Sequence, residues 1–260
     1  MNGKNVSIEA IKMFKKVPVG TTSRLTFVDH NETYGRHIID KVTKNLSLTT
    51  CLDIGCGTGN DLITVGRNNP NARLFGVDYG DWNKEILTKN QIEPISVNIE
   101  SDSLPFSDAS IDMIISNQVL EHTKEIYWIN HEIFRVLKVG GLFYLGVPNV
   151  LALHNRLLGL LGVHPTCSKI ISAHVRSFSK NDTLLFYKEI GGDFTDFDSF
   201  YGSQFYPFGK NVARFLSYIF PSLSLSIFFV FRKTGAYDGQ FINHLENNML
   251  ETNFFKGQSI

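Results

Sequence analysis

The sequence has no net charge, no cysteine framework and no long uninterrupted apolar run, and each absence excludes a class of protein. Its 260 residues contain 25 Lys and Arg against 25 Asp and Glu, which excludes a polycation built to wrap nucleic acid. The three cysteines, Cys51, Cys56 and Cys167, form no CxxC pair, so neither a disulfide framework nor a zinc ribbon is expected. A reducing compartment is the default for such a chain, and we predict a cytoplasmic location.

No segment has the composition of a signal peptide or of a membrane span. The first twenty residues mix four lysines with single apolar residues and lack the apolar run of a signal peptide. The most apolar stretch, 212–231, contains Arg214, Pro221 and four serines, so we expect no stable membrane insertion. A buried helix and a strand are predicted there instead. Hydrophobic residues make up 43% of the chain, enough to bury a substantial core.

Short β-rich runs alternate with longer amphipathic segments, which indicates a parallel sheet built from βαβ units. The expected strands are 50–54, 73–77, 94–98, 111–116 and 142–147, with two late strands near 194–201 and 225–232. The expected helices are 60–67, 81–87, 124–138, 151–161 and 179–190. We expect Gly140-Gly141 to end the third of these helices, and the Ser179 hydroxyl to cap the last.

The most informative residues run from Asp53 to Gly59, between an expected strand and an expected helix, and read Asp-Ile-Gly-Cys-Gly-Thr-Gly. A ligand is expected there because open α/β sheets bind ligands at the carboxyl ends of their strands. Glycine is needed where a side chain would block the approach of the backbone to a ligand. A dinucleotide fingerprint counted from Gly55 needs a third glycine at position 60, where the chain has Asn60. A nucleotide-linked oxidoreductase is therefore disfavoured.

This loop resembles the first motif of the class I S-adenosylmethionine-dependent methyltransferases, which reads acid-x-Gly-x-Gly-x-Gly, and the chain is similar to type 11/23-like methyltransferase domains. The likeness continues through Asp78 after the second strand. The later matching motifs are Leu104-Pro105-Phe106-Ser107-Asp108, Ile111 to His122, Phe134 to Gly141 and, more weakly, Pro148-Asn149 and His174 to Phe178. The last two resemble methyltransferases of glycan and small-metabolite pathways. Asn98 and Ile111 stand where the family often has an acid and a phenylalanine, and Val139 where it has a proline.

The resemblance implies an α/β, Rossmann-like fold, with a seven-stranded, mostly parallel sheet, helices on both faces and an antiparallel last strand. We expect an N-terminal helical cap at 1–46 and a methyltransferase domain at 47–233. Within that domain, an insertion at about 149–178 is expected to form a lid over the acceptor. A tail at 234–260 completes the predicted organisation.

S-adenosylmethionine is the cofactor that the resemblance implies. The cofactor-binding residues it implies are Asp53, Gly55, Gly57, Gly59, Asp78, Tyr79, Asn98, Ile99 and Asn117. Asp78 is placed to accept hydrogen bonds from the ribose hydroxyls, and Tyr79 and Asn98 to contact the adenine. Structural alternatives are a tight strand-to-helix turn for the glycines, a helix cap for Asp78 and strand or turn endings for Asn98 and Asn117.

The catalytic candidate is His122, which follows the fourth strand on the loop that faces the cofactor. An imidazole suits the removal of a proton from a hydroxyl acceptor, although a purely structural histidine is the alternative. His154 and His174 are second-rank candidates, and Arg176 either binds an anionic acceptor or lies in solvent. No spacing of His, Asp and Glu suggests a metal site, and none is predicted.

The predicted function is methyl transfer to a small molecule or glycan precursor, with oxygen as the expected acceptor atom. A non-catalytic scaffold that keeps the cofactor site is the main alternative. Nucleic-acid methylation is not expected, because the chain lacks a basic excess and the NPPY motif after the fourth strand. Aromatic residues crowd the stretch 194–231, either as an acceptor pocket or as core and lid packing.

Overall fold

The computed structural model describes residues 34–191, 196–248, 250 and 252–257, and it confirms the predicted fold class. In this part of the chain seven strands form one sheet in the order β3-β2-β1-β4-β5-β7-β6. The strands are β1 (Thr50–Ile54), β2 (Arg73–Asp78), β3 (Ile92–Ser96), β4 (Ile111–Asn117), β5 (Leu137–Pro148), β6 (Asp196–Tyr201) and β7 (Ser226–Arg232). β1 to β5 pair in parallel, and β7 lies antiparallel between β5 and β6.

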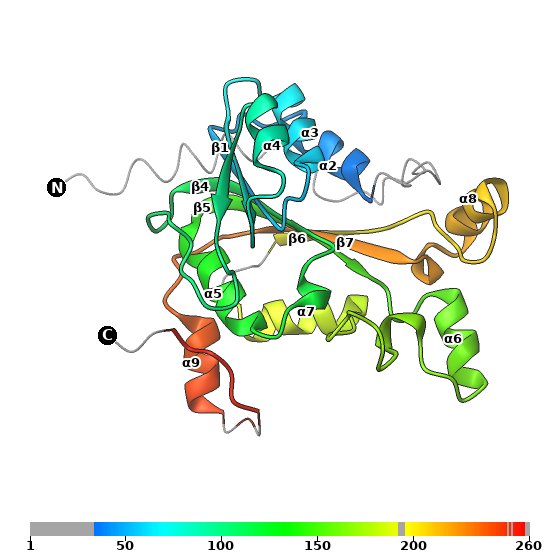
Figure 1. The fold of residues 1–260 in the computed structure, drawn as a ribbon. Helices are drawn as coiled ribbons and strands as arrows, with labels where there is room; N and C mark the ends of the chain where they lie inside the picture. The colour runs from blue at the N-terminus through cyan, green and yellow to red at the C-terminus, as the bar shows by residue number, and fades with distance from the viewer. Residues whose placement is uncertain (1–33, 192–195, 249, 251, 258–260) are drawn as a thin grey trace.

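Helices cover both faces of the sheet and make a three-layer molecule (Figure 1). The described helices are α2 (Arg36–Thr43), α3 (Asn60–Asn68), α4 (Lys84–Lys89), α5 (Ile126–Val136), α6 (Leu153–Leu160), α7 (Lys180–Glu189), α8 (Lys210–Ile219) and α9 (Gln240–Asn247), with short 3₁₀ turns η1 (Leu120–His122), η2 (Thr166–Ser168) and η3 (Pro221–Leu223). One apolar cluster packs α2, α3 and α4 on the sheet. A second packs α5, α7 and α9 on the opposite face.

The tail follows α9 and packs on α5. The backbone N–H of Phe255 donates to Glu125 Oε2 at 2.7 Å, and the rings of Phe254 and Phe255 contact Tyr127 and Trp128. The first 33 residues, where most of the expected N-terminal cap lies, are outside the described residues; α2 is the part of it that the structure describes. None of the described helices is long and apolar enough to cross a membrane.

Several sequence-based boundaries were wrong, and burial explains the clearest of them. The expected helix 124–138 ends at Val136, because Leu137 enters β5 fully buried and pairs with Ile111. Gly140-Gly141 therefore lies inside that strand and does not end the helix. β3 begins two residues earlier than expected and ends at Ser96, and α4 starts at Lys84. The Ser179 cap is confirmed, since its side chain accepts a hydrogen bond from the N–H of Asp182.

A helix forms in 212–231 as expected, but the prediction that it is buried was wrong. α8 projects from the end of the sheet (Figure 1), and its buried residues are Ala213 and Ser217, while Val212 and Phe215 are exposed. The strand predicted with it is β7, which is buried along almost all of its length. A high content of apolar residues in a segment does not by itself predict that the helix it forms is buried.

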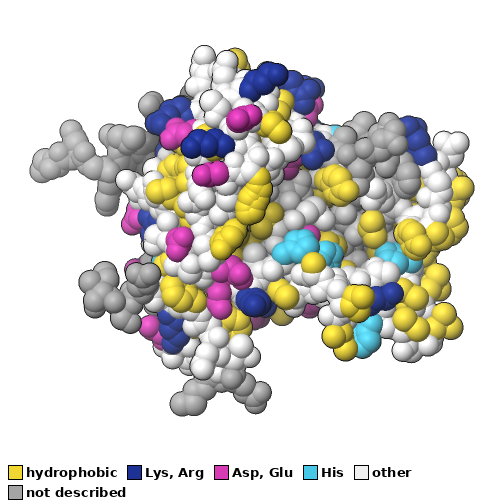
Figure 2. Space-filling model, viewed as in Figure 1, with side chains coloured by type: hydrophobic (Ala, Val, Ile, Leu, Met, Phe, Trp, Pro, Cys, Tyr) yellow, Lys and Arg dark blue, Asp and Glu magenta, His cyan; other side chains and the backbone are white. Residues whose placement is uncertain are grey.

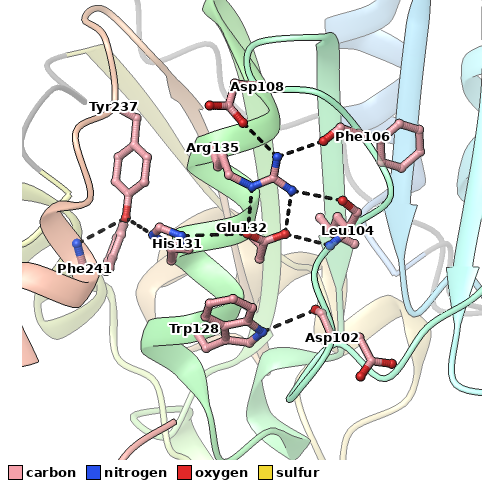
Figure 3. A network of polar contacts seen from close by, with 10 residues as sticks. All are labelled: Asp102, Leu104, Phe106, Asp108, Trp128, His131, Glu132, Arg135, Tyr237 and Phe241. Carbon is pink, nitrogen blue, oxygen red and sulfur yellow. Dashed lines mark hydrogen bonds and ion pairs between the residues drawn. The ribbon is translucent and has the colours of Figure 1, made fainter. Parts of the chain in front are cut away.

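Two of the sequence motifs are tied together by Arg135 on α5. Its guanidinium donates to the carbonyls of Leu104 and Phe106 and to the carboxylates of Asp108 and Glu132, at 2.7–2.9 Å (Figure 3). Hydrogen bonding to the buried Glu132 is the main cause that raises the pKa of Arg135. The Leu-Pro-Phe-Ser-Asp loop and the Arg135 helix therefore form one structural unit at the start of β4.

Candidate active site

The glycine loop after β1 leaves open space beside one of its three glycines. All three have positive φ angles, of 71° at Gly55, 50° at Gly57 and 76° at Gly59. A Cβ on Gly55 would lie 2.5 Å from the Val119 side chain, and one on Gly59 would lie 2.6 Å from Ile92. A Cβ on Gly57 would meet no atom within 4 Å. Packing explains the first and third glycines, whereas the space at Gly57 remains for a ligand.

Asp78, at the end of the neighbouring strand β2, holds its carboxylate over this loop. Its Oδ2 accepts a hydrogen bond from the N–H of Gly57 at 3.1 Å, and its Oδ1 accepts one from Tyr79 at 2.8 Å. Next to it the rings of Tyr79 and Trp82 meet edge to face with centroids 6.3 Å apart, and both are largely exposed. The carboxylate and the aromatic pair thus lie on the side of Gly57 where hydroxyls and a flat ring would fit. Sequence reasoning had identified Tyr79 but missed Trp82.

A buried acidic pair lies under the loop. Asp53 at the end of β1 and Asp61 in the first turn of α3 are 3% and 6% exposed. Arg36 Nε lies 2.7 Å from Asp61 Oδ1, and Arg36 is the one cation among the described residues that acts on both carboxyls. Burial raises the pKa of both acids. Two carboxyls sharing one cation favour a ligand that brings a positive charge.

Arg36 and Asp61 were not identified from the sequence. An acid one residue after Asn60, in the first turn of the helix that follows the glycine loop, was the signal for Asp61. Arg36 lies outside every motif, and only the folding of α2 onto α3 brings it to the site.

The remaining cofactor candidates lie near the loop but have protein partners. Asn117 donates from Nδ2 to Asp61 Oδ2 and to the backbone carbonyl of Tyr34, both at 2.8 Å. Asn98 follows β3 and accepts from the N–H of Glu100 at 3.2 Å, while Ile99 packs on the core below it. Val97 donates its N–H to the carbonyl of Asp78, so this turn adjoins the second-strand acid. Cofactor contact by Asn98, Ile99 and Asn117 stays a prediction.

A cluster of Glu121, His122 and His174 lies beyond the end of β4. The rings of His122 and His174 meet edge to face with centroids 4.7 Å apart, and His122 Nε2 lies 3.9 Å from Glu121 Oε1. Their side-chain ligand atoms all lie within 4.8 Å of one another. The sequence separates His174 from the other two by about fifty residues, so spacing gave no indication that the three residues meet. The expectation of no metal remains a prediction.

The contacts of His122 fix which ring nitrogen can act as a base. Its Nδ1 lies 3.3 Å from the backbone carbonyl of Ala173, an acceptor, so Nδ1 carries the proton in the neutral ring. The basic lone pair is then on Nε2, the atom closest to Glu121. His154 lies elsewhere, with its Nε2 bonded to Thr166 Oγ1 at 3.0 Å, and takes no part in this cluster.

Glu121 is almost fully buried, and within the described residues its Oε2 has no hydrogen-bond partner. Burial raises the pKa of this carboxyl to about 7. Arg176 does not neutralise it, since its guanidinium donates to the carbonyls of Thr123 and Lys124 and thereby holds the end of segment 149–178 against the residues that follow η1. Arg176 is therefore engaged with backbone and is not free in solvent.

The raised pKa of Glu121 predicts how stability changes with pH. The carboxyl titrates near 4.5 in the unfolded chain and near 7 in the folded protein, so the folded state binds more protons in between. Stability should therefore fall as pH rises from about 4.5 to about 7, by up to about 3 kcal/mol for this group. Urea unfolding of the wild type and Glu121→Gln at pH 5 and pH 8 measures this difference. The buried Asp53 and Asp61 are common to both proteins, and parallel pH profiles would contradict the assignment.

Comparisons with known proteins agree with this geometry. Residues 52–145 match the family model described as a methyltransferase domain. A demethylmenaquinone methyltransferase of Lactococcus lactis is 31% identical over 103 residues, which cover 37% of this chain and 41% of the relative. A probable S-adenosylmethionine-dependent methyltransferase of Mycolicibacterium smegmatis is 30% identical over 126 residues, covering 46% and 47%. The chain thus spans less than half the length of these curated relatives.

A solved structure shows the same fold. The S-adenosylmethionine-dependent methyltransferase of Thermotoga maritima, a possible histamine N-methyltransferase, aligns with a TM-score of 0.52 and 17% identity. The alignment covers 77% of this chain and 89% of that protein. S-adenosylmethionine is the cofactor of the methyltransferases that this chain resembles, and the space at Gly57 and the Asp78 carboxylate fit it. Residues 52–145 therefore form a methyltransferase domain similar to those of the class I S-adenosylmethionine-dependent methyltransferases.

Proposed function

We propose that this protein transfers a methyl group from S-adenosylmethionine to a small molecule, with an oxygen atom of the acceptor as the nucleophile. The observation that carries the proposal is the open space at Gly57, a residue whose backbone N–H donates to the Asp78 carboxylate. The donor brings an activated methyl group on a sulfonium, which is transferred by in-line displacement. The chain's own task is to hold donor and acceptor aligned and to remove a proton, and alignment can supply about 7–11 kcal/mol in favourable systems.

In this proposal each part of the loop region has one role. The backbone at Gly57 receives the amino-acid end of the donor, Asp78 accepts hydrogen bonds from the ribose hydroxyls, and the Tyr79 ring lies against the adenine. The Asp53–Asp61 pair offers the negative charge that a cationic donor requires. Asn117 acts indirectly, because it holds Asp61 in place.

His122 is the proposed base. As the bond from acceptor oxygen to methyl carbon forms and the carbon–sulfur bond breaks, Nε2 of His122 takes the hydroxyl proton. The imidazolium that results is stabilised by the carboxylate of Glu121, whose Oε1 lies 3.9 Å away. His174 packs against the ring and limits its rotation.

The acceptor class is proposed from the lid and from the relatives. The segment 149–178 joins β5 to α7 and brings His174 against His122 beyond the end of β4. The relative from L. lactis is named as acting on demethylmenaquinone, and the last matching motifs resemble enzymes of glycan pathways. A small molecule or glycan precursor with a free hydroxyl fits both. The three cysteines are free and buried, which supports the proposed cytoplasmic location.

The first experiment is binding. Calorimetry with S-adenosylhomocysteine and, separately, with NAD distinguishes this proposal from a nucleotide-linked oxidoreductase, and binding of NAD alone would overturn it. Incubation with labelled S-adenosylmethionine and fractions of a cell extract, followed by identification of the labelled product, then separates an enzyme from a non-catalytic scaffold. A scaffold would bind S-adenosylhomocysteine without labelling any fraction.

Removal of the His122 ring should affect turnover and leave donor binding intact. We expect His122→Ala to lower kcat about 10²-fold, the usual worth of a general base, with an unchanged Kd for S-adenosylhomocysteine. The matched control is His244→Ala on α9, whose ring stacks on Tyr127 in the first turn of α5 and has no contact with the Glu121–His122–His174 cluster among the described residues. Turnover of His122→Ala near that of the control would give His122 a structural role.

A further inference from the structure

The end of the molecule that carries α6 and α8 presents large apolar side chains to solvent. We call it the lid surface and define it by Leu157, Leu160, Ile170, Ile171, Phe215 and Ile219, all exposed. Figure 1 places α6 and α8 at this end, beyond the sheet, and Figure 2 shows hydrophobic side chains gathered over it. The segments that carry the two helices are joined by the ring contact of His154 with Tyr206 and by the hydrogen bond of Asn149 to the Ser222 carbonyl.

α8 is amphipathic with its apolar face turned outward. Val212, Phe215 and Ile219 recur at helical spacing and are 49%, 63% and 46% exposed, whereas Ala213 and Ser217 are buried against the protein. Ordinary surface helices bury the large apolar residues and expose the small polar ones. Folding of this chain alone leaves the apolar face of α8 without a partner in the described residues.

The lid also buries a polar residue and exposes large apolar ones. The buried residue of α6 is the polar Asn155, which bonds to the Asn149 carbonyl and to Thr166, while Leu157 and Leu160 face outward. After η2, Ile170 and Ile171 form a loop tip and are 97% and 92% exposed. Three separate segments therefore place apolar side chains at the same end of the molecule.

The charge of these segments has one sign. Segments 149–178 and 202–225 contain none of the 25 acidic residues of the chain. Their basic residues are Arg156, Lys169, Lys210 and Arg214, besides Arg176, whose guanidinium is bound to backbone carbonyls. Although the whole protein is neutral, this end is basic and apolar. A surface of this composition matches an anionic phospholipid bilayer, where apolar and aromatic side chains enter the headgroup boundary and Lys and Arg meet the lipid charges.

We infer that the lid surface docks on the surface of an anionic membrane, without crossing it. A second copy of the chain fits less well, because a two-fold interface would bring two basic patches together. A bilayer can also receive apolar side chains from three separate segments, because it does not need a surface of complementary shape. The lid would then be held at the membrane, where an acceptor with a lipid anchor becomes accessible.

Sedimentation with vesicles tests this inference without donor or acceptor, so it is independent of methyl transfer. The wild type should bind vesicles of equal parts phosphatidylcholine and phosphatidylglycerol, and bind pure phosphatidylcholine at least about tenfold more weakly. Ile170→Ser with Ile171→Ser should lower the partition coefficient about tenfold. The matched control is Ile86→Ser with Val139→Ser, two residues that are exposed on α4 and β5; it should bind like the wild type.

Two charge-reversal variants complete the test. Lys169→Glu should weaken vesicle binding about tenfold, whereas Lys84→Glu on α4 should not change it. Circular dichroism and the affinity for S-adenosylhomocysteine, unchanged in all these variants, show that folding is preserved. Equal binding to both vesicle types, or a dimer in light scattering that Ile170→Ser with Ile171→Ser dissolves, would overturn the inference.

Discussion

Gly57→Val is expected to lower the affinity for S-adenosylhomocysteine at least about 100-fold, a loss of about 2.7 kcal/mol or more. The valine side chain would enter the space beside Gly57, where no protein atom lies within 4 Å of an added Cβ. Because no atom of the described residues lies that close, the added Cβ meets no steric obstacle from the part of the fold that the structure describes. Calorimetric titration of the variant measures the effect directly.

Backbone strain must be separated from steric exclusion, since Gly57 has a φ of 50° and a β-branched residue there is disfavoured. Gly140→Val is the matched control. Gly140 has a φ of 85° and likewise no atom within 4 Å of its added Cβ, but it lies in β5 near the opposite ends of the parallel strands. We expect this control to lose stability and to bind S-adenosylhomocysteine normally. Equal affinity losses in the two variants would refute a ligand site at Gly57.

Arg135→Met should destabilise the protein by about 3–5 kcal/mol, the usual result of removing one partner from a buried ion pair. Figure 3 shows why the cost is high. The guanidinium satisfies two loop carbonyls and the carboxylate of Glu132, which is 3% exposed. Methionine fills similar volume but leaves Glu132 without its cation and releases the loop at Leu104. Chemical denaturation of both proteins gives the difference in unfolding free energy.

An exposed ion pair provides the comparison. Arg73 and Glu93 are 3.4 Å apart with side chains 70% and 58% exposed, and Arg73→Met should cost less than about 1 kcal/mol. The contrast between the two methionine variants isolates burial as the cause. A small effect of Arg135→Met would show that the loop 104–108 is held by its apolar contacts alone.

The sequence predicted those parts of the site that depend on local backbone chemistry. The glycine loop and Asp78 follow strands whose apolar runs were recognisable, and the loop lies where parallel strands end. The seven-stranded sheet with its antiparallel last strand followed from the family resemblance. His122 was found because it comes a few residues after β4.

The parts that the sequence did not predict depend on contacts between distant segments. Arg36 reaches Asp61 only after α2 packs on α3, and His174 meets His122 only after the lid returns to the end of β4. The exposure of the apolar face of α8 was not predicted, for another reason. Hydrophobic periodicity identifies which residues share a helix face but not what that face packs against. Small residues at 213 and 217 were the local sign that the opposite face is the one packed on the protein.

The position of β7 has a consequence for how the chain is synthesised. β5 ends at residue 148, but the strand that covers its free edge begins only at residue 226. While the ribosome adds the residues between them, β5 presents a row of unpaired backbone groups flanked by apolar side chains, the kind of edge that promotes aggregation. Nascent chains stopped before residue 226 should therefore require a chaperone to stay in solution, and chains released after residue 232 should not.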